Sequence, residues 1–139
     1  MSVIPLKLGA SVVDSEDAFQ KVNGFEGTAL LIFNLDKSQL EGTSSNISYE
    51  LRVGSEYRGH RDAEKTELPP GGDLLLRPGN AVLIQTEEVV FVPRNILGYV
   101  VPKVGLLQKG VSNTLSKIDP GYNGPLIVTL FNLARKSSP

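Results

Sequence analysis

The sequence predicts an all-β domain with at most one or two short helices. The main observation is a series of short apolar runs that are separated by turn signals, at residues 28–33, 47–53, 74–76, 81–86, 89–92, 97–101 and 126–133. The chain also contains nine prolines and 14 glycines, which disfavour helices as its main element. Short strands divided by Gly and Pro turns are typical of antiparallel sandwiches and barrels.

The chain length predicts a single domain over residues 1–139. Hydrophobic residues make up 40 % of the 139 residues, which is enough for a real core. We find no internal repeat and no interdomain linker. One early helix is predicted over Ser15–Val22, because Ser15 is a good N-cap and Asn23-Gly24 is a good helix end.

Composition excludes several classes of function. The 14 basic and 15 acidic residues form no basic field, so we expect no nucleic-acid partner. The absence of cysteine excludes disulfides, thiolate chemistry and a zinc deaminase built on a Pro-Cys-x-x-Cys motif. No signal peptide is evident, and the apolar run Ala29–Phe33 is too short to cross a bilayer, so we expect a cytoplasmic protein with no membrane partner.

The turn at residues 118–124 is the strongest candidate site. Gly121 and Gly124 allow positive φ and let a ligand approach the backbone, while Pro120 stiffens the chain next to Asp119. Tyr122 adds a flat ring. This combination suits a planar base and a sugar, with a carboxylate available to orient water. An ordinary hairpin turn remains the alternative interpretation of the same residues.

The segment Glu56–Asp73 is strongly polar and is predicted to be a solvated hairpin or loop. It contains His60, which is the only histidine of the chain. A second histidine for a two-histidine metal site is therefore lacking, and no Ser-His-Asp arrangement can be assembled. The sequence predicts no metal-binding residues.

Four blocks stand in order along the chain, at residues 34–54, 76–93, 102–111 and 118–124. The first contains Ser48-Tyr49-Glu50-Leu51-Arg52, the second Thr86-Glu87-Glu88, and the last Ile118-Asp119-Pro120-Gly121-Tyr122. Together they resemble the trimeric dUTPase and dCTP deaminase superfamily, with Glu50 where that family has aspartate. The first 33 residues are divergent, and the family's late strand and closing tail are expected to be missing, because the sequence stops at Arg135-Lys136-Ser137-Ser138-Pro139.

This resemblance implies a distorted jelly-roll-like β-barrel of the dUTPase type that assembles as a homotrimer. It implies sites between subunits for a deoxypyrimidine nucleotide, with magnesium present only when a triphosphate is bound. By this resemblance Asp119 would be catalytic: it would contact the sugar and orient the attacking water. Tyr122 and Gly121 would bind the nucleoside, and Tyr122 would exclude a 2′-hydroxyl. The loop with Lys103, Gly105 and Lys109 occupies the place of the family's phosphate-binding loop.

Two departures from the family pattern argue against full activity. Where the family presents an arginine and hydroxyls to the phosphates, this chain has Lys103 and Val104. A lysine offers no bidentate fork and a valine offers no donor. The glutamate that moves protons in the deaminases is replaced by Thr129, which cannot act as that base near neutral pH. Deamination of dCTP is therefore not expected.

Three interpretations follow from these residues. The first is a divergent member that binds deoxypyrimidine nucleotides with weak or no catalysis. The second is an active nucleotide hydrolase, chiefly a magnesium-dependent dUTP diphosphatase and only secondarily a dCTP deaminase. The third is a non-catalytic trimeric module that serves a structural or partner-binding role.

Overall fold

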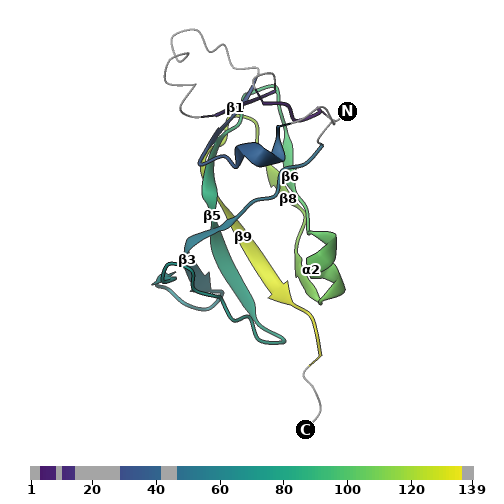
Figure 1. The fold of residues 1–139 in the computed structure, drawn as a ribbon. Helices are drawn as coiled ribbons and strands as arrows, with labels where there is room; N and C mark the ends of the chain where they lie inside the picture. The colour runs from purple at the N-terminus through teal and green to yellow at the C-terminus, as the bar shows by residue number, and fades with distance from the viewer. Residues whose placement is uncertain (1–3, 9–10, 15–28, 42–46, 136–139) are drawn as a thin grey trace. The chain divides into compact units, whose positions relative to one another are not determined.

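The computed structural model describes residues 4–8, 11–14, 29–41 and 47–135, and the predicted helix at 15–22 lies outside them. The chain divides into two compact units (Figure 1). Unit 1 is Met1–Arg52, Glu87–Gly98 and Ile118–Leu126, and unit 2 is Val53–Thr86, Tyr99–Lys117 and Ile127–Pro139. Strands β5 (Ala81–Phe91) and β9 (Asn123–Asn132) have residues in both. The single-domain assignment stays a prediction.

Unit 1 is built on three paired strands. Strand β1 (Val12–Asp14) runs parallel to β2 (Leu30–Phe33). Strand β2 pairs antiparallel with the last residues of β5, in the register that places Leu31 opposite Phe91. Its small core is Val13, Ala29 and Leu31, closed by the rings of Phe33 and Phe91, whose centroids lie 5.3 Å apart. These apolar residues are the reason why the segment pairs as a sheet.

Unit 2 is a second antiparallel arrangement. The first residues of β5 pair with β3 (Val53–Gly59), and β3 pairs in turn with β4 (Thr66–Glu67). Strand β9 pairs with β7 (Val111–Asn113). Val82, Ile84 and Val128 form the buried core. Alternate residues of β5 are buried, as expected for a strand with one face toward a core.

The remaining elements are short. They are the 3₁₀ helix η1 (Lys37–Gln39), the α-helix α2 (Val104–Gln108), and the two-stranded pair β6 (Gly98–Val100) with β8 (Ser116–Ile118). The described residues are therefore mostly β with short helices, which confirms the predicted class. None of the described helices has the length and apolar character needed to span a membrane.

Several apolar runs differ from their prediction, and residues 74–76 form no strand. Residues 81–86 and 89–92 were expected as separate runs, but Ala81–Phe91 is one continuous strand. The acidic pair between the runs does not end the strand, because Glu88 is buried and ion-paired. The run 47–53 joins a sheet only at Val53, because residues before it bond to side chains instead of a neighbouring strand.

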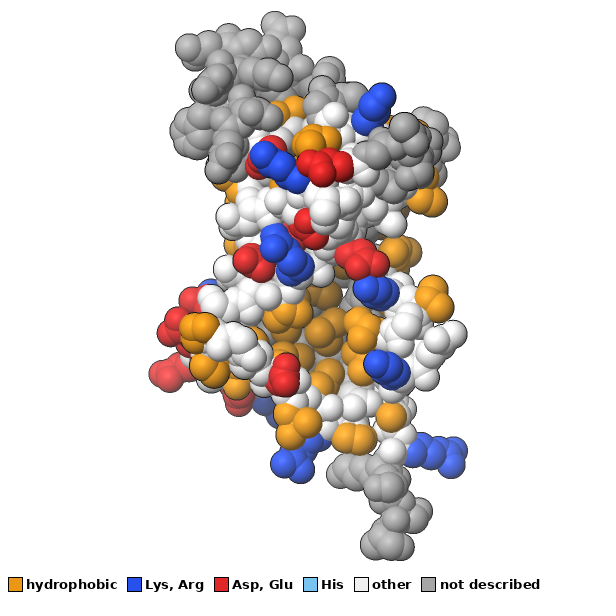
Figure 2. Space-filling view, in the orientation of Figure 1, with side chains coloured by type: hydrophobic (Ala, Val, Ile, Leu, Met, Phe, Trp, Pro, Cys, Tyr) orange, Lys and Arg blue, Asp and Glu red, His pale blue; other side chains and the backbone are white. Residues whose placement is uncertain are grey.

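The polar segment 56–73 is a hairpin, as predicted. Glu56 pairs with Glu67 and Tyr57 with Thr66 across strands β3 and β4. His60 lies exposed beyond the end of β3. On the opposite side of unit 2 in Figure 2, hydrophobic side chains stand beside lysine and arginine side chains in the part of the view where Figure 1 draws α2.

Candidate functional site

The turn that follows β8 has the geometry that its sequence predicts. The backbone N–H of Tyr122 donates to the carbonyl of Asp119 at 3.0 Å. Pro120 and Gly121 occupy the two central positions, and Gly121 has a φ of 84°. This is the type II turn, in which proline and glycine are the favoured central residues. Its backbone is therefore fixed by residue type.

Two further hydrogen bonds hold this turn to the residue after β5. The N–H of Gly121 donates to the carbonyl of Val92 at 2.9 Å, and the N–H of Val92 donates to the carbonyl of Tyr122 at 2.8 Å. Val92 is buried. The turn is consequently a rigid part of unit 1 and presents Asp119 at the surface.

Tyr122 lies over its own hairpin. Its hydroxyl donates to the carbonyl of Pro125. A Cβ added to Gly124 would stand 3.5 Å from that hydroxyl, and Gly124 has a φ of 143°. Glycine therefore permits both the backbone shape and the close ring. The side chain stays 37 % exposed, so one part of the ring is available to a ligand.

Arg94 is a residue that sequence reasoning missed. Its Cγ would lie 3.9 Å from a Cβ placed on Gly121, and it is exposed. The available signal was the Pro93-Arg94-Asn95 turn directly after the second sequence block. Unit 1 therefore brings Asp119, Gly121 and Tyr122 together with an arginine.

The predicted phosphate loop lies in unit 2. Lys103 is the N-cap residue of α2, and its carbonyl accepts hydrogen bonds from the N–H groups of Leu106 and Leu107, both at 3.0 Å. Gly105 faces open space, and Lys109 is exposed at the end of the helix. The structure thus brings Lys103, Gly105 and Lys109 together on one short helix. These three residues belong to unit 2, whereas the Asp119 turn belongs to unit 1.

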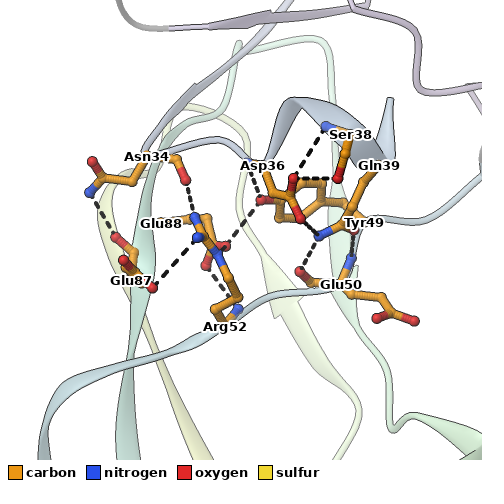
Figure 3. A network of polar contacts seen from close by, with 9 residues as sticks. All are labelled: Asn34, Asp36, Ser38, Gln39, Tyr49, Glu50, Arg52, Glu87 and Glu88. Atoms are coloured by element: carbon orange, nitrogen blue, oxygen red, sulfur yellow. Dashed lines mark hydrogen bonds and ion pairs between the residues drawn. The ribbon is translucent and has the colours of Figure 1, made fainter. Parts of the chain in front are cut away.

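A buried carboxylate organises a second polar group in unit 1 (Figure 3). Glu88 is 0 % exposed. Its Oε1 accepts from the Tyr49 hydroxyl at 3.0 Å and from Arg52 Nε at 2.8 Å. Its Oε2 accepts from the backbone N–H of Arg52 at 3.0 Å. Buried charge requires this kind of paired and hydrogen-bonded environment.

The same network continues through the guanidinium of Arg52. Its terminal nitrogens contact the carbonyl of Asn34 and, at 3.7 Å, the carboxylate of Glu87. Asn34 adopts a left-handed conformation with a φ of 58° and donates from its side chain to the Glu87 carbonyl at 3.0 Å. The hydrogen bond to Glu88 raises the pKa of Arg52 above its usual value. The guanidinium thus bridges β2, β5 and the segment before β3.

Tyr49 and Asp36 extend the network to η1. The Tyr49 hydroxyl accepts from the Asp36 N–H at 2.9 Å, and Asp36 accepts from the Ser38 hydroxyl at 2.6 Å. Hydrogen bonds from Ser38 lower the pKa of Asp36, whereas burial raises the pKa of Tyr49. Gln39 holds the Glu50 backbone through hydrogen bonds of 2.7 and 3.1 Å. Gln39 thus holds the backbone of Glu50, which lies outside the strands.

The network has an architectural role that sequence reasoning did not assign. Tyr49 and Arg52 belong to the first sequence block and Glu88 to the second. Their contacts show what these residues do together: the phenol and the guanidinium both donate to the buried carboxylate. Within the described ranges, no group of three or more His, Cys, Asp or Glu side chains is placed to hold a metal ion.

Comparison with known families decides where this chain belongs. Residues 25–137 match the model of the family described as dCTP deaminase-like. The chain belongs to the dCTP deaminase-like family. Its membership explains the order of the sequence blocks and the turn at Asp119.

Individual members of the dCTP deaminase-like family are distant from this chain. It is 28 % identical over 88 residues to the dCTP deaminase of Thermococcus gammatolerans, covering 63 % of this chain and 55 % of the relative. It is 30 % identical over 88 residues to the dCTP deaminase of Pyrococcus abyssi, covering 63 % and 56 %. The chain therefore spans about half the length of the curated relatives it matches.

A solved structure supports the same family fold. The 2′-deoxycytidine 5′-triphosphate deaminase from Agrobacterium tumefaciens superposes with a TM-score of 0.54 at 17 % sequence identity. The match covers 85 % of this chain and 40 % of that one. At this identity the likeness concerns the fold, and it agrees with the predicted dUTPase-type β architecture.

Proposed function

We propose that this protein binds deoxypyrimidine nucleotides at the Asp119 turn, with weak or no catalysis. The observation that carries the proposal is the rigid type II turn with an exposed carboxylate, a bare glycine backbone and an accessible tyrosine ring. Such a turn offers backbone groups to a base and an aromatic surface to a sugar. Membership of the dCTP deaminase-like family supports this choice of ligand.

The turn residues take separate roles in this proposal. Gly121 leaves space for the pyrimidine beside the backbone, while Gly124 accommodates the Tyr122 ring. Tyr122 packs against deoxyribose and crowds a 2′-hydroxyl. Asp119 binds the sugar and, if hydrolysis occurs, orients the attacking water. Arg94 lies beside Gly121 and supplies a positive charge near the ligand.

Phosphate binding is assigned to Lys103, Gly105 and Lys109. Gly105 leaves the helix surface open, and the two exposed lysines flank it. Each lysine acts as a point charge without the planar fork of arginine, and Val104 adds no hydrogen-bond donor. Weak phosphate binding is the consequence, and it is the reason for proposing little catalysis.

Magnesium enters this proposal only with a nucleoside triphosphate. The described residues show no acidic cluster that would hold the ion alone. Phosphate oxygens would provide ligands for the ion, which is the usual way in which proteins bind magnesium with nucleotides.

We further propose a homotrimer with sites shared between subunits. Fourteen large hydrophobic side chains are exposed among the described residues, and a trimer interface would cover part of this apolar surface. Light scattering at micromolar concentration should give three times the monomer mass of 15.0 kDa. A stable monomer would contradict a shared pocket.

A thermal-shift screen with deoxynucleotides and magnesium tests nucleotide binding directly. Ligand that binds only the folded state raises the melting temperature by mass action. We expect dUTP, dTTP or dCTP to stabilise the protein more than the matching ribonucleotides. No shift with any nucleotide would favour the non-catalytic trimeric module.

Product analysis separates binding from hydrolysis. The retained Asp119 and Tyr122 favour a dUTP diphosphatase as the second candidate function. Release of dUMP and pyrophosphate from dUTP, lost in Asp119→Asn, would establish that activity. The asparagine keeps the size of the side chain and removes only its charge, so the fold should be unchanged.

Tyr122→Ala should weaken deoxynucleotide binding and relax the preference against a 2′-hydroxyl. The ring provides both the packing surface against the deoxyribose and the crowding of a 2′-hydroxyl, and alanine removes both. Calorimetry with a non-hydrolysable dUTP analogue and its ribose counterpart measures both effects. Tyr122→Phe is the matched control: it removes the hydrogen bond to Pro125 but keeps the ring, so discrimination should persist.

Val104→Ser should strengthen binding of the same triphosphate analogue. It restores one hydroxyl to an exposed position of α2, where a hydrogen bond to phosphate contributes about 1 kcal/mol. Val104→Ala controls for the loss of side-chain volume and should show no gain. Equal affinities of the wild type, Val104→Ser and Val104→Ala would contradict a role of α2 in phosphate binding.

A further inference from the structure

Unit 2 has a cavity beside the hairpin that strands β3 and β4 form. The cavity has a volume of about 160 Å³ and is lined by residues of β3, β5, β9 and the segment between β3 and β4. All of these lining residues belong to unit 2, and the proposed nucleotide site uses none of them. We call this feature the hairpin cavity.

The hairpin cavity lies on the face of the sheet that points away from the core of unit 2. Val82 and Ile84 of β5 are buried in that core, so Leu83 and Gln85, which line the cavity, point to the other face. Arg58 of β3 pairs with Leu83 and therefore shares this face. The cavity is consequently a recess in the surface that a ligand can reach from solvent.

One wall of the hairpin cavity is apolar. Ala63, Leu83 and Ile127 contribute to it, and Ile127 is 63 % exposed. An engineered protein cavity of about 150 Å³ with an apolar lining binds benzene. The hairpin cavity therefore has the volume for an apolar group of about the size of one six-membered ring.

The charged lining of the cavity is positive by one unit. Arg58 and Lys65 are basic, and Glu56 is the one acid among the described residues that line the cavity. Lys65 Nζ lies 3.0 Å from Glu56 Oε2, so these two charges offset each other. Arg58 is half-buried and donates from Nη1 to the carbonyl of Asp62 at 3.2 Å. This bond uses one of the five N–H donors of the guanidinium, which suits a carboxylate as a further acceptor.

We propose that the hairpin cavity binds a small organic carboxylate whose apolar body is about the size of one ring. The carboxylate pairs with Arg58, and the apolar body packs against Leu83 and Ile127. This site goes beyond the proposed nucleotide binding and does not depend on it. Inorganic phosphate lacks the apolar body, and an organic ammonium ion of the same size has the wrong charge for Arg58.

A titration of the full chain with benzoate, followed by ¹H–¹⁵N correlation NMR, tests this site. We expect a Kd of about 1 mM, which is in the range for a ligand of this size. The amide signals of residues 56–58, 63–65, 83–85 and 127 should shift. Benzylamine has the same ring with the opposite charge, and acetate has the same charge without the ring. Each should bind at least about tenfold more weakly than benzoate.

Variants of the lining separate the charge from the apolar wall. Arg58→Met should weaken benzoate binding at least about tenfold, whereas Arg77→Met, at an exposed arginine of unit 2 outside the cavity, should not change it. Ile127→Ala should also weaken binding, and the fold should tolerate it because Ile127 is exposed. Glu56→Gln should strengthen binding about two- to fivefold, because it removes a like charge and releases Lys65.

Equal benzoate affinities of the wild type, Arg58→Met and Ile127→Ala would overturn the site. So would the absence of any shift in the signals of the cavity residues, and tighter binding of benzylamine than of benzoate would overturn the role of Arg58. Asp119→Asn should leave the benzoate affinity unchanged. Failure of nucleotide binding and failure of this site are therefore measured independently.

Discussion

Arg52→Met should lower the free energy of unfolding by about 1–3 kcal/mol, since it leaves the buried carboxylate of Glu88 without its half-exposed charged partner. Glu88 is 0 % exposed, and Arg52 Nε is its charged partner at 2.8 Å. Methionine keeps most of the aliphatic side chain, so the loss measures the charge and its hydrogen bonds. The Tyr49 hydroxyl and the backbone N–H of residue 52 still donate to the Glu88 carboxylate in this variant. The loss of stability is therefore smaller than if the carboxylate had no donor left.

Urea denaturation followed by tyrosine fluorescence measures this change, because the chain has four tyrosines and no tryptophan. Glu87→Gln is the control: its side chain is 50 % exposed and lies 3.7 Å from Arg52, so it should change stability by less than about 1 kcal/mol. Arg52→Met combined with Glu88→Gln should recover part of the loss, because the buried charge is gone. If Arg52→Met were as stable as wild type, the network would have no structural role.

The mostly-β class was predictable because turn-forming residues separate most of the apolar runs. Strand β9 and the hairpin at 56–73 followed from the same pattern. The continuous β5 did not, because two adjacent glutamates suggest a strand end unless one of them is known to be buried. That burial depends on Arg52, which lies 36 residues earlier in the sequence. A pattern of neighbouring residues does not reveal a partner that lies so far away in the sequence.

The candidate site was predictable where backbone shape depends on residue type. Pro120 and Gly121 determine the turn, and the structure shows the predicted positive φ at Gly121. The position of Arg94 beside that turn was not predictable, because it results from the pairing of Val92 with residues 121 and 122.

The protein should not deaminate dCTP at an ordinary enzymatic rate. Position 129 of β9 holds threonine where the resemblance to the deaminases places a proton-moving glutamate. A general base contributes roughly 10²–10⁴-fold to a rate, and a threonine hydroxyl does not accept a proton near neutral pH. From a median turnover of about 10 per second, the loss gives less than about 0.1 per second.

Ammonia release and dUTP formation from dCTP and magnesium measure the rate, with thermal shift on the same sample to confirm that dCTP is bound. Thr129→Glu should raise the rate if nucleotide binds and only the base is missing, whereas Thr129→Gln should not, since an amide of the same size cannot take the proton. Wild-type turnover near about 10 per second would show that another residue moves the proton. That result would contradict the assignment of position 129 and, with it, the proposal of weak catalysis.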